Sequence, residues 1–154
     1  MIKPASKKKL AATLAVALLM STTATVAENS FEQEIEYRQG VMSILSWNMK
    51  HLGGMLKGKQ PYDAEKIKTH AADIASVASL NIMAGFPEDS TGEDSSALED
   101  IWMDFETFEE KMDDFKKAAD AMNMAAQSGD KGAVATAMGP LGDSCKGCHK
   151  PFKN

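Results

Sequence analysis

The sequence predicts an all-α protein, an antiparallel four-helix bundle with up-down-up-down topology. Three observations lead to this prediction. Apolar residues recur at spacings of three and four in four blocks between Phe31 and Phe152, which is the period of an amphipathic helix. No stretch of strand length alternates apolar and polar residues. Most connections between the blocks are short, so we expect consecutive helices to run antiparallel.

An apolar run near the start predicts a cleaved signal peptide over residues 1–27, ahead of one bundle domain over residues 28–154. Four lysines precede the run Leu10–Met20, and Thr25 and Ala27 supply the small residues that a signal peptidase reads. The run is shorter than the roughly 20 residues of a membrane span. We therefore expect cleavage after Ala27, export to the periplasm and no membrane association afterwards.

The net charge of residues 28–154 limits the partners that this domain can bind. The leader holds four of the 17 basic residues and none of the 22 acidic ones, so residues 28–154 carry 13 basic and 22 acidic side chains, net −9. Such a balance argues against nucleic acid and anionic membrane surfaces as partners. The expected product is an acidic, exported, single-domain protein.

The first two blocks predict a helical hairpin. The first runs from Phe31 to Leu56 and ends before the stretch GKQP at residues 58–61. Asp63 is placed to cap the N-terminus of the next helix, whose apolar face runs from Ile67 to Ala78.

The last two blocks follow the longest connection, a loop from Gly85 to about Ser95 that is rich in Gly, Pro, Asp and Ser. One helix is expected from Ile101 to Ala126, and a turn at residues 128–130 leads to the block from Val134 to Phe152. Proline inside a helix removes a backbone hydrogen bond, so Gly139-Pro140 should kink or restart this last helix without dividing it in two.

The chain closes on DSCKGCHKPFKN, in which Cys145, Cys148 and His149 share one helical turn. A redox dithiol usually begins a helix in a strand–helix context, which is missing here. Zinc needs four ligands, and the other histidines, His51 and His70, lack ligand-like spacing. A disulfide over three residues would close a very small loop. Covalent haem remains the favoured chemistry, with two thioether bonds and a histidine for the iron.

At this point the chain resembles the cytochrome c′ family, the class II c-type cytochromes, which are themselves a standard example of this bundle topology. The resemblance covers residues 28–154 and rests on four stretches: IEYRQGVM, MLKGKQPYDAEKI, DIWMDFETF and SCKGCHKPFK. Attachment near the C-terminus separates this class from ordinary cytochromes c. It implies one haem c per chain, held covalently inside the bundle.

The resemblance also implies roles for particular residues. Cys145 and Cys148 would be the thioether anchors and His149 the axial iron ligand. Arg38 and Gln39 would contact a haem propionate and the haem edge. Arg38 is notable without the resemblance, because it stands where the helical period calls for an apolar residue, and a buried charge needs a partner. Ser96 aligns roughly with a position that touches haem in relatives.

Met42, one helical turn after Arg38, matches the family position over the distal face of the iron. In typical cytochromes c′ this side chain blocks the sixth site without ligating, which leaves a five-coordinate, high-spin iron. In low-spin relatives of the c-556 type a first-helix methionine becomes the sixth ligand. Both possibilities stay open from the sequence, although methionine is a common gap filler in apolar cores.

Function follows from these features as a set of expectations. A histidine-ligated iron with an apolar distal side favours NO and CO, and electron transfer is compatible with it. We expect a binding and redox protein, not an enzyme, whose acidic cluster at residues 106–114 would suit a basic redox partner. The family resemblance implies a homodimer through the first two helices, where Trp47 lies outside the main apolar stripe. A more distant hypothesis is a haemless metal-binding or chaperone-like periplasmic protein.

Overall fold

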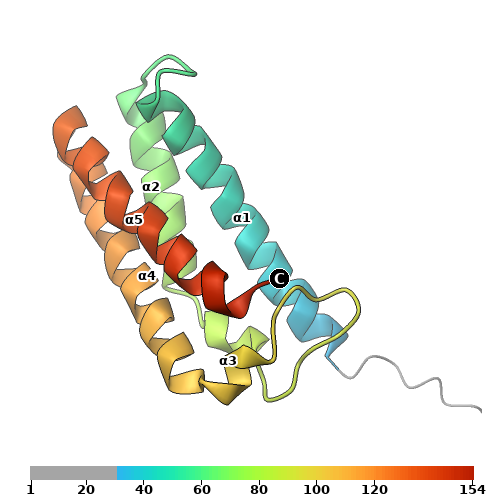
Figure 1. The fold of residues 1–154 in the computed structure, drawn as a ribbon. Helices are drawn as coiled ribbons and strands as arrows, with labels where there is room; N and C mark the ends of the chain where they lie inside the picture. Colours follow the sequence, from blue (N-terminus) through green and yellow to red (C-terminus); the bar gives the residue numbers. More distant parts are fainter. Residues whose placement is uncertain (1–30) are drawn as a thin grey trace, which may run out of the picture.

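The computed structural model describes residues 31–154, so the expected signal peptide over residues 1–27 lies outside the described residues. The elements are α1 (Glu32–Leu56), α2 (Ala64–Ala78), the 3₁₀ helix η1 (Ile82–Gly85), α3 (Asp100–Met103), α4 (Phe105–Gln127) and α5 (Lys131–Phe152). The four long helices form an antiparallel bundle, which confirms the predicted fold class (Figure 1). In residues 31–154, no helix combines the length and apolar character needed to cross a membrane.

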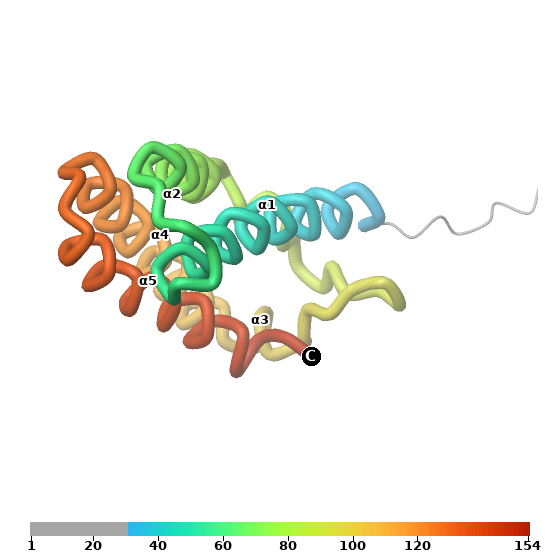
Figure 2. Tube along the Cα trace, turned by 90° about the horizontal axis from the view of Figure 1, so that it is seen from above, coloured from blue at the N-terminus to red at the C-terminus, as the bar shows by residue number. Residues whose placement is uncertain are grey.

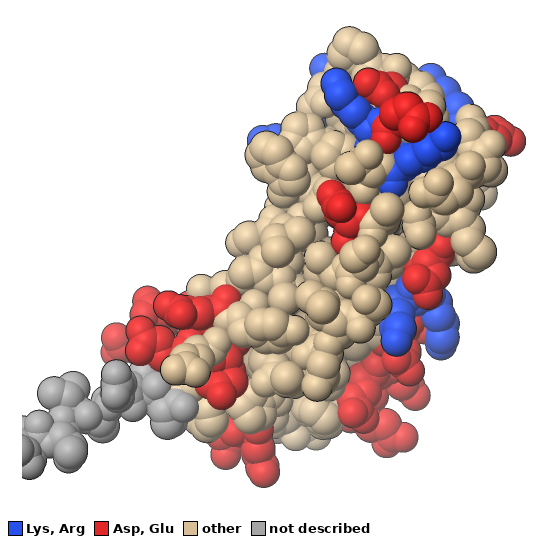
Figure 3. Space-filling view, turned by 180° about the vertical axis from the view of Figure 1, so that it is seen from behind, with Lys and Arg blue, Asp and Glu red and all other residues tan. Residues whose placement is uncertain are grey.

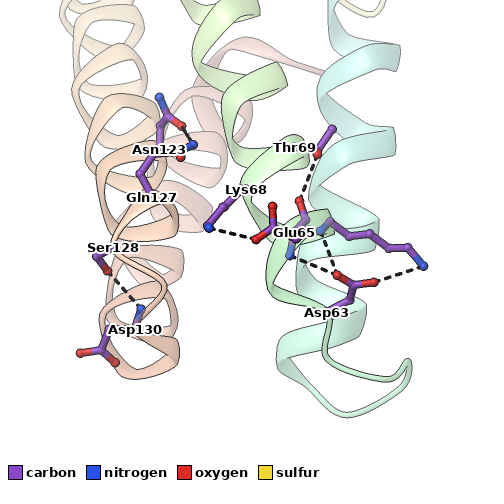
Figure 4. A network of polar contacts seen from close by, with 9 residues as sticks. Asp63, Glu65, Lys68, Thr69, Asn123, Gln127, Ser128 and Asp130 are labelled. Atoms are coloured by element: carbon purple, nitrogen blue, oxygen red, sulfur yellow. Dashed lines mark hydrogen bonds and ion pairs between the residues drawn. The ribbon is translucent and has the colours of Figure 1, made fainter.

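Two aspartates fix where α2 and α5 begin. The Asp63 carboxylate accepts hydrogen bonds from the backbone amides two and three residues on, both at 3.1 Å, as predicted (Figure 4). Asp130 does the same for α5, at 2.7 and 3.3 Å. Gly58 and Gly129 lie in the turns that precede α2 and α5. Their φ angles are +69° and +74°, a conformation that favours glycine.

The third predicted helix is divided in the structure, which corrects the single helix expected from Ile101 to Ala126. Asp104 breaks the helix with φ −133° and ψ 57°, and α4 starts at the next residue. The short η1 helix was also not predicted. By contrast, α5 continues through Pro140 as one element, as expected.

Packing is uneven around the bundle. The closely packed helix pairs are α1 with α2, α2 with α4, and α4 with α5, whereas α1 and α5 do not pack closely along their lengths (Figure 2). The core is fullest where α2 and α4 meet, and its completely buried side chains there include Ile67, Ala71, Ile74, Ala119 and Met122. Two cavities lie along the space between α1 and α5.

Charge is distributed unevenly along the bundle axis. On the face drawn in Figure 3, acidic side chains gather mainly at the lower end, while the largest group of lysines lies near the upper end, where α1 connects to α2. The C-terminus of α5 lies at the opposite end from this connection (Figure 1).

Candidate functional site

The last turns of α5 bring the predicted cofactor-binding residues together. Cys145, Cys148 and His149 stand at positions i, i+3 and i+4 of this helix, so they share one face. All three line a cavity of about 910 Å³ between α1 and α5, at the upper end of the size range of ligand pockets. Both cysteines are half-buried free thiols, so the disulfide alternative finds no support.

The protonation states of these groups argue against a redox dithiol. Burial, and then the neighbouring Cys145, raise the pKa of the Cys148 thiol to about 11. Burial likewise raises the pKa of Cys145. Reactive dithiols have lowered pKa values, so this pair is poorly suited to thiol exchange. Desolvation, and then Lys153, lower the pKa of His149, which favours the neutral imidazole that a metal ion requires.

The zinc alternative has no geometric basis in the described part of the chain. Across residues 31–154, no three His, Cys, Asp or Glu side chains are grouped so that they could hold a metal ion. His51 and His70 lie instead between α1 and α2, where their rings stack at a centroid distance of 5.1 Å. The Nδ1 atom of His70 lies 2.8 Å from the Asn48 side-chain oxygen. These two histidines form a separate polar cluster.

Met42 lies on the α1 wall of the same space. It is half-buried, and it lines both the large cavity and a second one of about 350 Å³. The two cavities share only four lining residues, namely Met42, Met112, Cys148 and His149. Apart from His149, these four residues have no strongly polar side chain, so ligand binding where the two cavities meet would depend on apolar contacts.

Arg38 lines the second cavity and is almost completely buried, with 4% of its surface exposed. Its Nη1 atom donates to the Gly85 carbonyl oxygen (2.9 Å) and the Ser90 hydroxyl (2.8 Å), and Nη2 donates to the Ser90 carbonyl oxygen (2.5 Å) and the Ser95 hydroxyl (2.6 Å). The guanidinium also lies 5.0 Å from the centre of the Phe86 ring. This side chain fastens α1 to the connection between η1 and α3.

The charge of Arg38 has no close counter-charge. Within the described residues no carboxylate lies within 4.0 Å of it, and burial lowers its pKa although Glu34 acts in the opposite direction. Neutral oxygens satisfy its hydrogen bonds but leave its charge uncompensated, which is costly in a buried position. A buried cation at a cavity wall fits an anionic group inside that cavity.

Residues 86–97, which we call the strap, cover one side of the second cavity. Gln39, an exposed residue, donates to the Asp94 carbonyl oxygen at 2.6 Å. Ser96 lines the cavity, and its carbonyl oxygen accepts from the Asn154 amide at 2.9 Å. The hydroxyls that bind Arg38 belong to Ser90 and Ser95, which sequence reasoning missed because no periodic signal marks them. The strap thus joins α1 to the end of α5.

The residues present fit a covalent haem. Two neutral thiols and a neutral imidazole face a large apolar cavity, a methionine stands on the opposite wall, and a buried cation without a counter-charge lines the adjoining cavity. Cys145 and Cys148 would hold such a group, and His149 would ligate its iron.

Comparison with known proteins tests this interpretation. The family model described as Cytochrome C' matches residues 33–153. The chain belongs to the cytochrome c′ family. It is 38% identical over 128 residues to cytochrome c′ of Halomonas halodenitrificans, covering 79% of this chain and 96% of the relative. A solved cytochrome c′ from Shewanella frigidimarina superposes with a TM-score of 0.77 at 37% identity, covering 83% of this chain and 98% of the other. Cytochromes c′ carry covalent haem, so the family implies haem c.

Two further structures of cytochromes c′ bear on function. One, from Alcaligenes xylosoxidans, is a nitric oxide complex of a variant protein, with a TM-score of 0.73 at 28% identity over 83% of this chain and 98% of that one. Another is described as showing unusual ligand-controlled dimer dissociation, with a TM-score of 0.75 at 26% identity over 80% of this chain and 96% of that one. Nitric oxide binding and ligand-controlled dimer dissociation are properties of those two relatives.

Proposed function

We propose that the protein is a periplasmic c-type haem protein that binds NO and CO at an open sixth position and also transfers electrons. The observation that carries the proposal is the shared face of Cys145, Cys148 and His149 on a large apolar cavity, with Met42 on its other wall. The nitric oxide complex of a family member adds support. When bound, the haem supplies an iron that accepts diatomic ligands and single electrons.

The chain's own residues would do the following. Cys145 and Cys148 would anchor one haem per chain, and His149 would ligate its iron. Arg38 neutralises a propionate through the charge that no carboxylate balances, and Gln39 and Ser96 contact the haem edge. Met42 would crowd the side of the cavity across from His149 and exclude large or strongly hydrated ligands, so the site would bind ligands without turning over a substrate.

Absorption spectra of the haem-loaded protein test this proposal. Adding CO to the reduced form should shift the Soret band strongly, because a five-coordinate iron has a free position. The absence of covalently bound haem after maturation in a host that attaches c-type haem would overturn the proposal.

A second candidate is a low-spin electron carrier of the c-556 type with Met42 as the sixth ligand. Its support is that Met42 from α1 and His149 from α5 both line the two cavities. A ferric protein of this kind would show a methionine-to-iron charge-transfer band, and Met42→Ala would abolish it and change the spin state. If the spin state is the same in Met42→Ala, methionine ligation is ruled out.

We also propose a homodimer formed through α1 and α2. Ile44 (49% exposed) and Trp47 (62% exposed) lie three residues apart on α1, so they form one apolar surface patch, and such patches mark interaction sites. The dimer of a relative adds support. Sedimentation velocity should give a dimer for the mature protein and a monomer for Trp47→Glu. An exposed acidic cluster on α4 would be the docking surface for a basic redox partner.

Export is the remaining part of the proposal. Cleavage after Ala27 would leave Glu28 as the first residue, and mass spectrometry of the periplasmic fraction measures this directly. A protein that keeps residues 1–27 and remains with the membrane would contradict it.

A further inference from the structure

The large cavity between α1 and α5 opens to water among exposed, positively charged side chains. Three of the lysines that line it, Lys50, Lys57 and Lys59, belong to α1 and the turn after it, and a fourth, Lys146, belongs to α5. We call these four lysines the basic rim. Among residues 31–154, the one carboxylate in the lining of this cavity is that of Asp143, which pairs with Lys146 at 3.2 Å. Positive charges therefore outnumber negative ones at the opening.

Three lysines of the basic rim are not neutralised by neighbours. No carboxylate in the described part of the chain lies within 4.0 Å of Lys50, Lys57 or Lys59. Lysines elsewhere do form such pairs, as Lys68 does with Glu65 at 3.0 Å. The charges of the rim can therefore act on an anionic group outside the protein.

The basic rim contrasts with the charge of the rest of the domain. Residues 28–154 carry 13 basic and 22 acidic side chains, net −9. None of the carboxylates in the acidic cluster on α4, residues 106–114, lines either cavity, and the strap over the second cavity holds four more exposed carboxylates, namely Glu88, Asp89, Glu93 and Asp94. Regions of opposite charge are thus separated, so a charged partner is oriented as well as attracted.

The basic rim surrounds the same cavity that the predicted haem-binding residues line. Cys145, Cys148 and His149 face this space, and Lys146 stands in the same helical turn as the two cysteines. A partner that rests on the rim approaches a group held by these residues without crossing the strap or the bundle core. Charge and a short path for electrons therefore coincide at this opening.

We propose that the basic rim is the docking surface for an acidic redox protein, one whose own cofactor is surrounded by carboxylates. This inference rests on the proposed function, because it names the class of partner that exchanges electrons with the same site. The acidic cluster on α4 is a separate surface of opposite charge. An anionic membrane fits the rim less well than a protein does, since an extended negative surface also faces the net negative charge of the domain.

The test follows oxidation of the reduced, haem-loaded protein by two small complexes of opposite charge, each of which accepts one electron. These are trianionic ferricyanide and tricationic tris(phenanthroline)cobalt(III), mixed with the protein in a stopped-flow spectrometer. Raising the ionic strength from about 0.01 M to about 0.15 M should slow the ferricyanide reaction and speed the cobalt reaction, because salt screens attraction and repulsion alike. The net charge of −9 predicts the reverse. A ferricyanide reaction that becomes faster with salt would overturn the proposal.

Single charge reversals locate the effect on the surface. Lys50→Glu and Lys59→Glu should each slow the ferricyanide reaction by about threefold at low ionic strength, and by much less at high ionic strength. Lys116→Glu is the matched control, because Lys116 is an exposed lysine of α4 that lines neither cavity, and the change in net charge is the same. Its rate should be close to that of the parent protein. Equal effects at Lys50 and Lys116 would show that only net charge matters, which would overturn the docking role.

Poly-glutamate, an acidic polypeptide, serves as the macromolecular probe. It should slow the ferricyanide reaction of the parent protein by covering the rim, and Lys50→Glu should weaken this competition. Sedimentation with phosphatidylglycerol vesicles, unaffected by poly-glutamate, would overturn the proposal in favour of a membrane surface. A protein that carries haem but exchanges electrons with neither complex would instead overturn the proposed electron-transfer function.

Discussion

The interface between α2 and α4 and the space between α1 and α5 are built from similar residue types but differ in how they are filled. Ile74 on α2 is completely buried in protein, whereas Met42 and Met49 on α1 are half-buried and line a cavity. A helical apolar stripe is present in both places. The difference indicates that the sequence pattern specifies an apolar face, while the content of the space, side chains or a cofactor, depends on the chemistry of the C-terminal motif.

The largest effect should come from the filled interface. Replacing Ile74 with alanine removes a side chain with no exposed surface, and the resulting cavity should lower the free energy of unfolding by about 3 kcal/mol. The control, Met49→Ala on the α1 side of the large cavity, should cost less than about 1 kcal/mol because its side chain already borders empty space. Urea titration followed by circular dichroism measures both. Equal losses would contradict the contrast between the two regions.

A smaller effect is expected where the strap closes the space between α1 and α5. Arg38→Leu leaves the acceptor groups of Gly85, Ser90 and Ser95 without their donor, and it should cost about 2 kcal/mol. Hydrogen exchange should rise in the strap and at the Asn154 amide. The control is Gln39→Ala, which removes one exposed hydrogen bond and should change stability by less than about 0.5 kcal/mol. Unchanged exchange in the strap would show that Arg38 does not hold it.

These contrasts also show how far the sequence could be read. The four blocks of apolar spacing predicted the four long helices, and Asp63 was predicted as a cap because a carboxylate at that place satisfies free backbone amides. The break at Asp104 was missed because the apolar spacing continues across it, from Ile101 to Phe105 and Phe108. Local propensity is weaker than such packing demands.

The candidate site shows the same division. The spacing of Cys145, Cys148 and His149 predicted that they would share a face, because residues three and four apart meet on a helix. The hydrogen bonds from Arg38 to Ser90 and Ser95 depend on a loop whose course has no periodic signal.

The open space should make α5 more dependent on its own cap than a helix packed on several sides. Asp130→Ala removes the carboxylate that binds the first free amides of α5, and it should cost about 1 kcal/mol. The control is Asp120→Ala on the exposed face of α4, which should be neutral within about 0.5 kcal/mol. Thermal unfolding of the two variants measures the difference, and equal melting temperatures would contradict a capping role.

The smallest effect concerns the interface between α1 and α2, which combines apolar packing with the polar pair of Asn48 and His70. Desolvation, and then His51, lower the pKa of His70, although Asp73 opposes them. Below about pH 6.5 the unfolded chain therefore takes up a proton more readily than the folded one, so the free energy of unfolding falls as the pH is lowered through this range. His70→Gln keeps an amide that can pair with Asn48 but cannot titrate. The difference in stability between the parent protein and His70→Gln should shift against the parent on acidification from pH 7 to pH 5, as measured by urea titration. A difference that stays constant over this range would show that the interface does not respond to protonation of His70.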